Sequence, residues 1–199
     1  MTTLKTLLVQ ARLDWQDPDR NRERLGRMLE SAEDAFDLAV LPETFTTGFL
    51  GDADLPGEGM DGPTVAWMRE QAARHGSALA GSAVITEHGN RYNRMLFVTP
   101  DGEVRHYDKR HRFAFGGESR RYTGGDVRVV VDFHGWRINL QVCYDLRFPV
   151  WCRNRGDYGE RPPGSGHPVR CLQLYDVPSA GEYGRGGRGL HGSLGGRGG

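Results

Sequence analysis

The chain has 199 residues, enough for one domain with a sizeable core, and its 26 basic and 26 acidic residues cancel to a formal net charge of zero. A balanced charge gives no global field that would favour nucleic acid or a membrane surface as a partner. The apolar run in MTTLKTLLVQARLDW is too short for a signal peptide or membrane span, and three cysteines without CxxC spacing argue against disulfides and structural zinc, so we expect a cytoplasmic protein.

The first predicted elements alternate between strands and helices. A strand is expected in LKTLLVQARL (residues 4–13) and a helix in DPDRNRERLGRMLESAED (17–34), where Asp17 can cap and Pro18 can open the helix. The short apolar run DLAVLPE predicts a second strand. PTVAWMREQAARHG predicts a second helix, which Pro63 begins and Gly76 ends.

The remaining elements of the ordered part are strands. SALAGSAVIT predicts one strand, RYNRMLFVTPDGEVRHYDK a hairpin that turns at Pro100-Asp101-Gly102, and VRVVVDFHGWRINLQVCYD a second hairpin that turns at His134-Gly135. The resulting order β-α-β-α-β-β-β-β-β predicts an α/β architecture in which helices pack outside layered sheets.

The composition changes abruptly after Arg155. Residues 156–199 hold 14 of the 29 glycines, and only six of these 44 residues are Ile, Leu, Val, Phe, Met or Trp. So little apolar surface does not offset the entropy of ordering a chain. We therefore expect a domain at 1–155 and a Gly/Arg/Pro-rich tail at 156–199 that is either disordered or the product of a shifted reading frame in a GC-rich gene.

Three polar residues stand at the ends of apolar runs. Glu43 follows DLAVLP, Lys109 follows EVRHYD, and Cys143 follows INLQV. Because active sites of sheet proteins gather where strands end, a carboxylate, an ammonium and a thiol at three such ends could converge. Each residue also has a structural explanation: a buried inert thiol, a solvated or capping glutamate, and a lysine in the charged surface run DKRHR.

Together the three groups have a coherent chemistry. A free thiol has a pKa of about 8.5, so a neighbouring glutamate would have to accept its proton at neutral pH. The lysine ammonium would stabilise the oxyanion that forms when the thiolate attacks an amide, which is worth on the order of 3 kcal/mol per donor. The sequence thus predicts amide hydrolysis through a thioester intermediate, without a metal or other cofactor.

The residues around this trio resemble the nitrilase, or carbon–nitrogen hydrolase, superfamily, whose members carry a Glu-Lys-Cys triad in this order. LPETFTTGF resembles the glutamate motif, YDKRHRFAFGGE the lysine motif and CYDLRFPVWCRN the nucleophile motif, and the match runs from about residue 4 to 155. The resemblance implies that Glu43 is the general base, Lys109 the oxyanion stabiliser and Cys143 the nucleophile. It also implies that Glu118 is a second glutamate, which positions the lysine or the substrate.

The first and third motifs look most like those of ω-amidases, which deaminate ω-amides of 2-oxo acids such as 2-oxoglutaramate and 2-oxosuccinamate. The resemblance implies a small-molecule amide substrate and makes the backbone N–H of Tyr144 a second oxyanion donor. We expect Phe45 and Phe115 to line the substrate pocket. Arg147 is expected either to reach the pocket or to hold the loop after the cysteine.

The resemblance also implies an αββα sandwich and a homodimer for an intact family domain. Family members continue past residue 155 with further strands and a helix, whereas this chain continues with GDYGERPPGSGHPVRC. We therefore expect an incomplete sandwich that folds poorly and has weak or no activity. The alternative is a non-catalytic nitrilase-like fragment whose Arg/Gly tail binds RNA or a partner.

Overall fold

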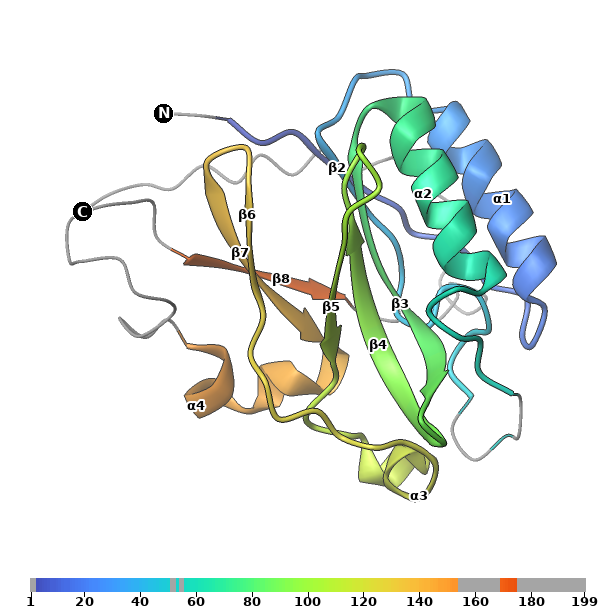
Figure 1. Ribbon diagram of the computed structural model, residues 1–199, viewed down its shortest axis with the longest axis vertical. Coiled ribbons are helices and arrows are strands. Elements are labelled where there is room, and N and C mark those ends of the chain that lie inside the picture. The colour runs from blue at the N-terminus through green and yellow to red at the C-terminus, as the bar shows by residue number, and fades with distance from the viewer. Residues whose placement is uncertain (1–2, 51–52, 54–55, 154–168, 175–199) are drawn as a thin grey trace, which may run out of the picture.

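The computed structural model describes residues 3–50, 53, 56–153 and, for the backbone, 169–174 (Figure 1). The strands are β1 (Thr6–Leu8), β2 (Leu38–Val40), β3 (Ala78–Glu87), β4 (Asn90–Val98), β5 (Val104–Asp108), β6 (Val130–Phe133), β7 (Trp136–Val142) and β8 (Val169–Leu174). The α-helices are α1 (Pro18–Glu30), α2 (Pro63–His75), α3 (Glu118–Arg121) and α4 (Pro149–Cys152), and two 3₁₀ turns are η1 (Ala114–Gly116) and η2 (Cys143–Arg147).

The strands form two sheets. The first sheet has the order β1-β2-β3-β4-β5, in which β1, β2 and β3 run parallel and the β3–β4 and β4–β5 pairs are antiparallel. The second sheet has the order β6-β7-β8, with an antiparallel β6–β7 hairpin and a parallel β7–β8 pair. Figure 1 shows α1 and α2 on one side of the first sheet and the second sheet on the other.

Alternate residues of the first sheet enter two different cores. In β4, Met95 and Phe97 belong to the core between the two sheets, whereas Leu96 and Val98 belong to the core under the helices. This division follows from the two-residue period of a strand. The described residues therefore form three layers of the expected sandwich, helix on sheet on sheet, and confirm the α/β fold class.

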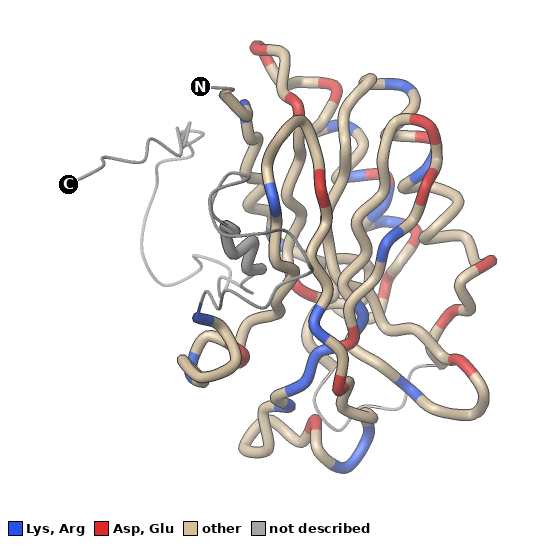
Figure 2. Tube along the Cα trace, turned by 60° about the vertical axis from the view of Figure 1, so that its left-hand side comes forward, with Lys and Arg blue, Asp and Glu red and all other residues tan. Residues whose placement is uncertain are grey.

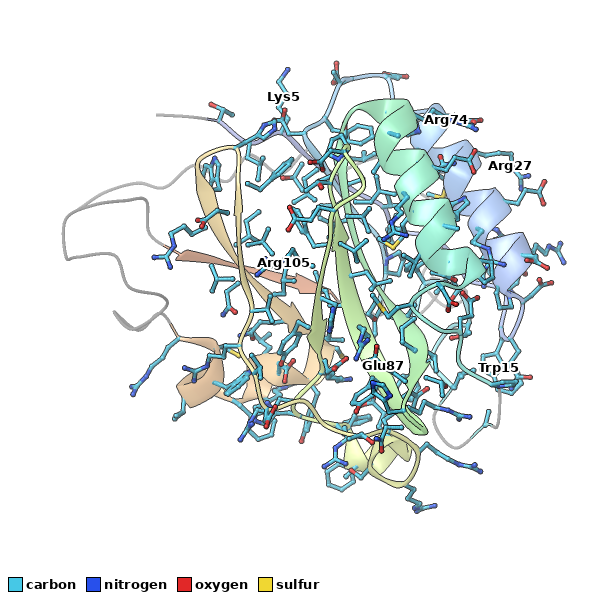
Figure 3. All side chains as sticks on the ribbon, in the orientation of Figure 1. Lys5, Trp15, Arg27, Arg74, Glu87 and Arg105 are labelled. Carbon is cyan, nitrogen blue, oxygen red and sulfur yellow. The ribbon has the colours of Figure 1, made fainter. Side chains whose placement is uncertain are left out.

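The helix boundaries follow the sequence signals. The side chain of Asp17 caps α1 by accepting a hydrogen bond from the backbone N–H of Arg20 at 3.1 Å. Gly76 ends α2 in the left-handed conformation, with φ of 60°. Arg27 and Arg74 project from the outer side of the helix pair (Figure 3), where they form ion pairs with glutamates of the same layer. The polar faces of both helices are therefore the solvent faces, as the sequence pattern predicts.

Both predicted hairpins are confirmed. β4 and β5 pair on either side of the Pro100-Asp101-Gly102 turn, and β6 and β7 pair on either side of His134-Gly135. His134 and Gly135 both have positive φ, 47° and 78°, which is the conformation of a tight two-residue hairpin turn. The first strand is shorter than expected, since only Thr6–Leu8 finds a partner in the three-residue β2.

Six residues of the tail, which the sequence analysis expects to be either disordered or the product of a shifted reading frame, have strand structure. Residues 169–174 form β8, which pairs with β7 in parallel from Arg137–Val169 to Val142–Leu174. A sheet edge offers unpaired backbone N–H and C=O groups that a passing segment can satisfy with little apolar area of its own. The rest of the tail, including its proposed role in RNA binding, lies outside the described residues.

The distribution of charge, the hydropathy of the helices and the grouping of polar side chains each add an observation. Acidic and basic residues are interspersed along the described chain (Figure 2). In the part that the structure describes, no helix is long and apolar enough to cross a bilayer, and no group of three or more His, Cys, Asp or Glu residues is arranged to hold a metal ion.

Candidate active site

The structure brings the predicted triad together at one end of the sheets. Lys109 directly follows β5 and Cys143 directly follows β7, and these two strands run toward the same end, the lower one in Figure 1. Glu43 lies three residues beyond β2. The ammonium nitrogen of Lys109 is 2.8 Å from Oε1 of Glu43, and the thiol of Cys143 forms a hydrogen bond with Glu43. The side chains of Glu43 and Lys109 are each 1% exposed, so neither is a surface charge.

Glu118 completes the charged cluster. It is the first residue of α3, and its two carboxylate oxygens lie 3.0 and 2.8 Å from the Lys109 ammonium. Its Oε2 also accepts the backbone N–H of Phe113 at 2.5 Å, which ties the loop after Lys109 to the lysine itself. Glu118 therefore contacts Lys109 directly, and its expected role in positioning the lysine or the substrate stays a prediction.

Asn93 is a site residue that the sequence analysis missed. It lies on β4, is buried, and donates from Nδ2 to Oε1 of Glu43 at 2.9 Å and to Oε1 of Glu118 at 3.1 Å. Oε1 of Glu43 therefore accepts from both Asn93 and Lys109, which leaves Oε2 as the oxygen free to take a proton. A polar residue within the strand sequence RYNRMLFV could have indicated a site residue. Its partners come from distant parts of the chain, so the sequence alone did not single it out.

The cluster holds two carboxylates and one ammonium in a buried place. Burial by itself lowers the pKa of Lys109, but the adjacent Glu43 and Glu118 raise it further than burial lowers it, so the net shift is upward. Lys109 is therefore charged at neutral pH and can stabilise a developing oxyanion. The two amide N–H groups of Asn93 partly compensate the excess negative charge.

Cys143 is held in a strained conformation with its thiol protonated. Its φ is 41°, in the left-handed region that side chains other than glycine rarely adopt, immediately after the extended β7. Burial, followed by the neighbouring Glu43, raises the pKa of the thiol to about 12, and Lys109 only partly offsets this rise. Cys143 is thus a neutral thiol at rest, and a nucleophilic role would require that its proton pass to Glu43.

This raised pKa makes a prediction for the chemical reactivity of Cys143. Only the thiolate is alkylated, so the rate of modification by iodoacetamide is expected to rise about tenfold per pH unit from pH 7 to about pH 11. Peptide mass mapping at residue 143 over this pH range measures the rate. A plateau that begins by about pH 9.5, as for a free thiol with a pKa of about 8.5, would show that the neighbouring groups do not hold the proton on sulfur.

The loop that carries Glu43 is clamped from two sides. The backbone N–H of Thr44 donates to the hydroxyl of Ser82 at 2.8 Å, and the backbone C=O of Thr46 accepts from the buried side-chain amide of Asn21 at 2.7 Å. Gly81 allows the loop to approach β3 closely, because a Cβ there would lie 2.8 Å from the ring of Phe45. These contacts fix the carboxylate in front of Lys109.

Of the residues expected to line the pocket, Phe45 packs in the core between the helices and β3, after the chain turns at Thr44, whose φ is 43°. Its role as a pocket residue stays a prediction. Phe115 is 90% exposed in η1, and Arg147 is exposed at the end of η2. Tyr144 follows Cys143 and is half-buried.

An aromatic group that the sequence analysis did not single out lies beside the nucleophile. The ring of Tyr144 packs edge-on against Phe113 at 5.1 Å and against Phe148 at 5.3 Å between centroids. Phe113 in turn has its backbone N–H on Glu118. These rings pack around Tyr144, the residue that follows Cys143, and are further candidates for an apolar wall beside the thiol.

Comparison with known proteins agrees with the site. The carbon–nitrogen hydrolase family profile matches residues 6–159. The chain belongs to this family. Its relatives include the omega-amidase YafV of Yersinia enterocolitica, 44% identical over 161 residues that make up 79% of this chain and 61% of the relative. YafV of Escherichia coli K12 is 42% identical over 158 residues, with the same coverage of 79% and 61%.

A solved structure of the same family has the same fold as this chain. XC1258 from Xanthomonas campestris, a CN-hydrolase superfamily protein with an arsenic adduct in its active site, is 50% identical with a TM-score of 0.83, covering 92% of this chain and 68% of that one. An amidase from Nesterenkonia at 24% identity and a TM-score of 0.67 supports the fold alone. The chain spans about three fifths of the length of the curated relatives it matches.

Proposed function

We propose that this chain hydrolyses the amide of a small linear substrate, an ω-amide of a 2-oxo acid such as 2-oxoglutaramate or 2-oxosuccinamate, to the carboxylate and ammonia. The observation that carries the proposal is the buried, hydrogen-bonded contact of Glu43, Lys109 and Cys143. The choice of substrate is supported by relatives named omega-amidase and by the 2-oxoglutaramate amidase of Bacillus subtilis, which is 27% identical over 154 residues.

The first half of the reaction forms a thioester. Glu43 accepts the proton of the Cys143 thiol as the sulfur attacks the amide carbon, so an S–C bond forms and the carbonyl oxygen becomes an oxyanion. The Lys109 ammonium and the backbone N–H of Tyr144 stabilise this charge. When the intermediate collapses, the C–N bond breaks and the proton held on Glu43 passes to the nitrogen, which leaves as ammonia.

The second half releases the acid. A water molecule takes the place of ammonia, Glu43 accepts one of its protons, and the hydroxide adds to the thioester carbon. Collapse then breaks the S–C bond, and the sulfur recovers the proton from Glu43. Glu43 thus acts as base and then as acid in each half, while Glu118 and Asn93 hold the base and the ammonium in place.

Ammonia release tests the proposal directly. The chain is expected to release ammonia from 2-oxoglutaramate faster than from glutamine. Cys143→Ala is expected to lower the rate of ammonia release at least a thousandfold. Cys171→Ala is the matched control, since it replaces a cysteine of β8, a strand that carries no member of the Glu43–Lys109–Glu118 cluster, and it is expected to keep the rate within threefold. Equal rates for Cys143→Ala and the unaltered chain would contradict the proposal.

Two further expectations go with this function. Because the chain spans about three fifths of its relatives, we propose that its turnover is slower than that of a full-length relative such as YafV, assayed side by side. A homodimer, which the family resemblance implies, is a separate proposal that light scattering of the purified chain tests.

A further inference from the structure

A third buried carboxylate lies in the turn that begins at Cys143, outside the cluster of Glu43, Lys109 and Glu118. Asp145, in η2, is fully buried. Its Oδ2 accepts from the hydroxyl of Tyr107 at 2.8 Å and from the backbone N–H of Val142 at 3.1 Å. Its Oδ1 accepts from the backbone N–H of His111 at 3.0 Å and lies 2.8 Å from Nδ1 of the same residue. All of these partners face one carboxylate.

The partners of Asp145 surround two of the proposed catalytic residues. Tyr107 lies two residues before Lys109, and His111 lies two residues after it, whereas Val142 directly precedes Cys143. Lys109 follows a strand of the first sheet, and Cys143 follows a strand of the second. One carboxylate therefore joins the segment that carries the ammonium to the turn that carries the thiol, across the boundary between the sheets.

The partners are themselves fixed. The hydroxyl of Tyr107 accepts from the backbone N–H of Arg110 at 3.2 Å and from Nε1 of Trp151 at 3.1 Å, so its own proton is directed at Asp145. The ring of His111 stacks on Phe148 with 3.6 Å between centroids. Rigid partners on every side make the carboxylate a fixed point in the site.

We propose that Asp145 is a positioning residue that sets the oxyanion site, by holding the Lys109 ammonium and the backbone N–H of Tyr144 at a fixed separation on either side of the reacting carbon. This inference rests on the proposed function for the roles of Lys109 and Tyr144. The backbone of Cys143 is strained, with a positive φ, and it needs such an anchor because a turn in this conformation relaxes when its surroundings do not hold it. A displacement of about 1 Å between such groups costs on the order of 100-fold in rate.

Asparagine at position 145 would break the anchor without changing its size. The carboxylate accepts from both sides, whereas an amide offers one accepting oxygen and a nitrogen that can only donate. Asp145→Asn would therefore leave either the Tyr107 and Val142 donors or the His111 donors facing an N–H₂ group. The turn would shift relative to Lys109 to relieve this contact.

An aldehyde probe tests the inference without requiring turnover. The Cys143 thiol adds across the C=O bond of butyraldehyde: an S–C bond forms, the C=O bond becomes single, and the thiol proton passes to the oxygen through Glu43. This adduct places its oxygen in the oxyanion site, whereas alkylation by iodoacetamide needs only the thiol and its base. Asp145→Asn is expected to weaken binding of ¹³C-labelled butyraldehyde, followed by NMR, at least tenfold and to keep the alkylation rate at residue 143 within threefold.

Two further variants make the test decisive. Asp132→Asn is the matched control, since Asp132 lies on β6 with its side chain 70% exposed, and it is expected to change neither quantity. Tyr107→Phe removes one partner of Asp145 without adding a donor, and is expected to weaken aldehyde binding even where Asp145→Asn fails to fold. Unchanged aldehyde affinity in Tyr107→Phe, or an equal fall in aldehyde binding and alkylation, would overturn the inference.

The test separates this inference from the proposed function. If the unaltered chain captures the aldehyde but releases no ammonia from ω-amides, the proposed substrate fails while the role of Asp145 is still decided by its variants. If the unaltered chain captures no aldehyde, the oxyanion site is not formed, and the inference about Asp145 is overturned.

Discussion

Replacing Lys109 with methionine is expected to abolish turnover and to lower the free energy of unfolding by about 3–5 kcal/mol, as is usual when one partner of a buried ion pair is removed. The methionine side chain fills a similar volume but leaves Glu43 and Glu118 facing each other without the ammonium that lies 2.8 Å from each. One of the two carboxylates must then take up a proton to stay buried.

This uptake of a proton gives the loss of stability a pH dependence. The folded variant binds more protons than the unfolded one, so its free energy of unfolding falls as pH rises, by up to about 1.4 kcal/mol per pH unit. Urea unfolding of Lys109→Met is therefore expected to show a larger deficit at pH 8 than at pH 5.

Lys5→Met is the matched control for this experiment. It replaces the other lysine of the chain, an exposed residue at the far end of the first sheet (Figure 3), and is expected to change stability by less than about 0.5 kcal/mol. A deficit in Lys109→Met that is the same at pH 5 and pH 8 would show that the two carboxylates are not coupled through Lys109.

Replacing Glu43 with glutamine is expected to reduce kcat by about 10²–10⁴-fold, because the amide cannot accept the proton of the Cys143 thiol. The effect on the free energy of unfolding should be much smaller than that of Lys109→Met. The glutamine carbonyl can still accept from Asn93 and Lys109, and the buried cluster then holds one carboxylate, Glu118, against one ammonium. We expect the free energy of unfolding to stay within about 1 kcal/mol of the unaltered chain.

Steady-state kinetics and urea unfolding of the same preparation measure both quantities for Glu43→Gln. Glu70→Gln, an exposed residue of α2 paired with Arg74, is the matched control and should alter neither. A kcat within tenfold of the unaltered chain would mean that another group, or water, takes the thiol proton, and the assignment of Glu43 as general base would fail.

Much of the fold could be predicted from local signals. Asp17 and Gly76 mark helix ends through backbone chemistry that depends on few neighbours, and His134-Gly135 specifies its turn because both residues tolerate positive φ. β8 could not be predicted in this way. Its pairing depends on the free edge of β7, which exists only after β6 and β7 have formed their hairpin.

The site shows the same division. Glu43, Lys109 and Cys143 could be selected because polar residues at the ends of apolar runs are conspicuous, and the structure brings them together. The packing of Phe45 in the core under the helices was not apparent from the sequence, because a turn of the backbone at Thr44 directs its side chain there. No period in the sequence reports such a turn.

The sequence by itself determined the family, the order of the elements and the three residues proposed to carry the reaction. Only the tertiary structure decided which groups hold those three in place: Asn93 between the two glutamates, and Asp145 between the lysine segment and the nucleophile turn. The physical reason is the range of the interactions involved. Caps, turns and apolar periods act over a few residues. The partners of Asn93 are 25 and 50 residues away, and Tyr107 and His111 are 38 and 34 residues from Asp145, so these groups meet only in the folded chain.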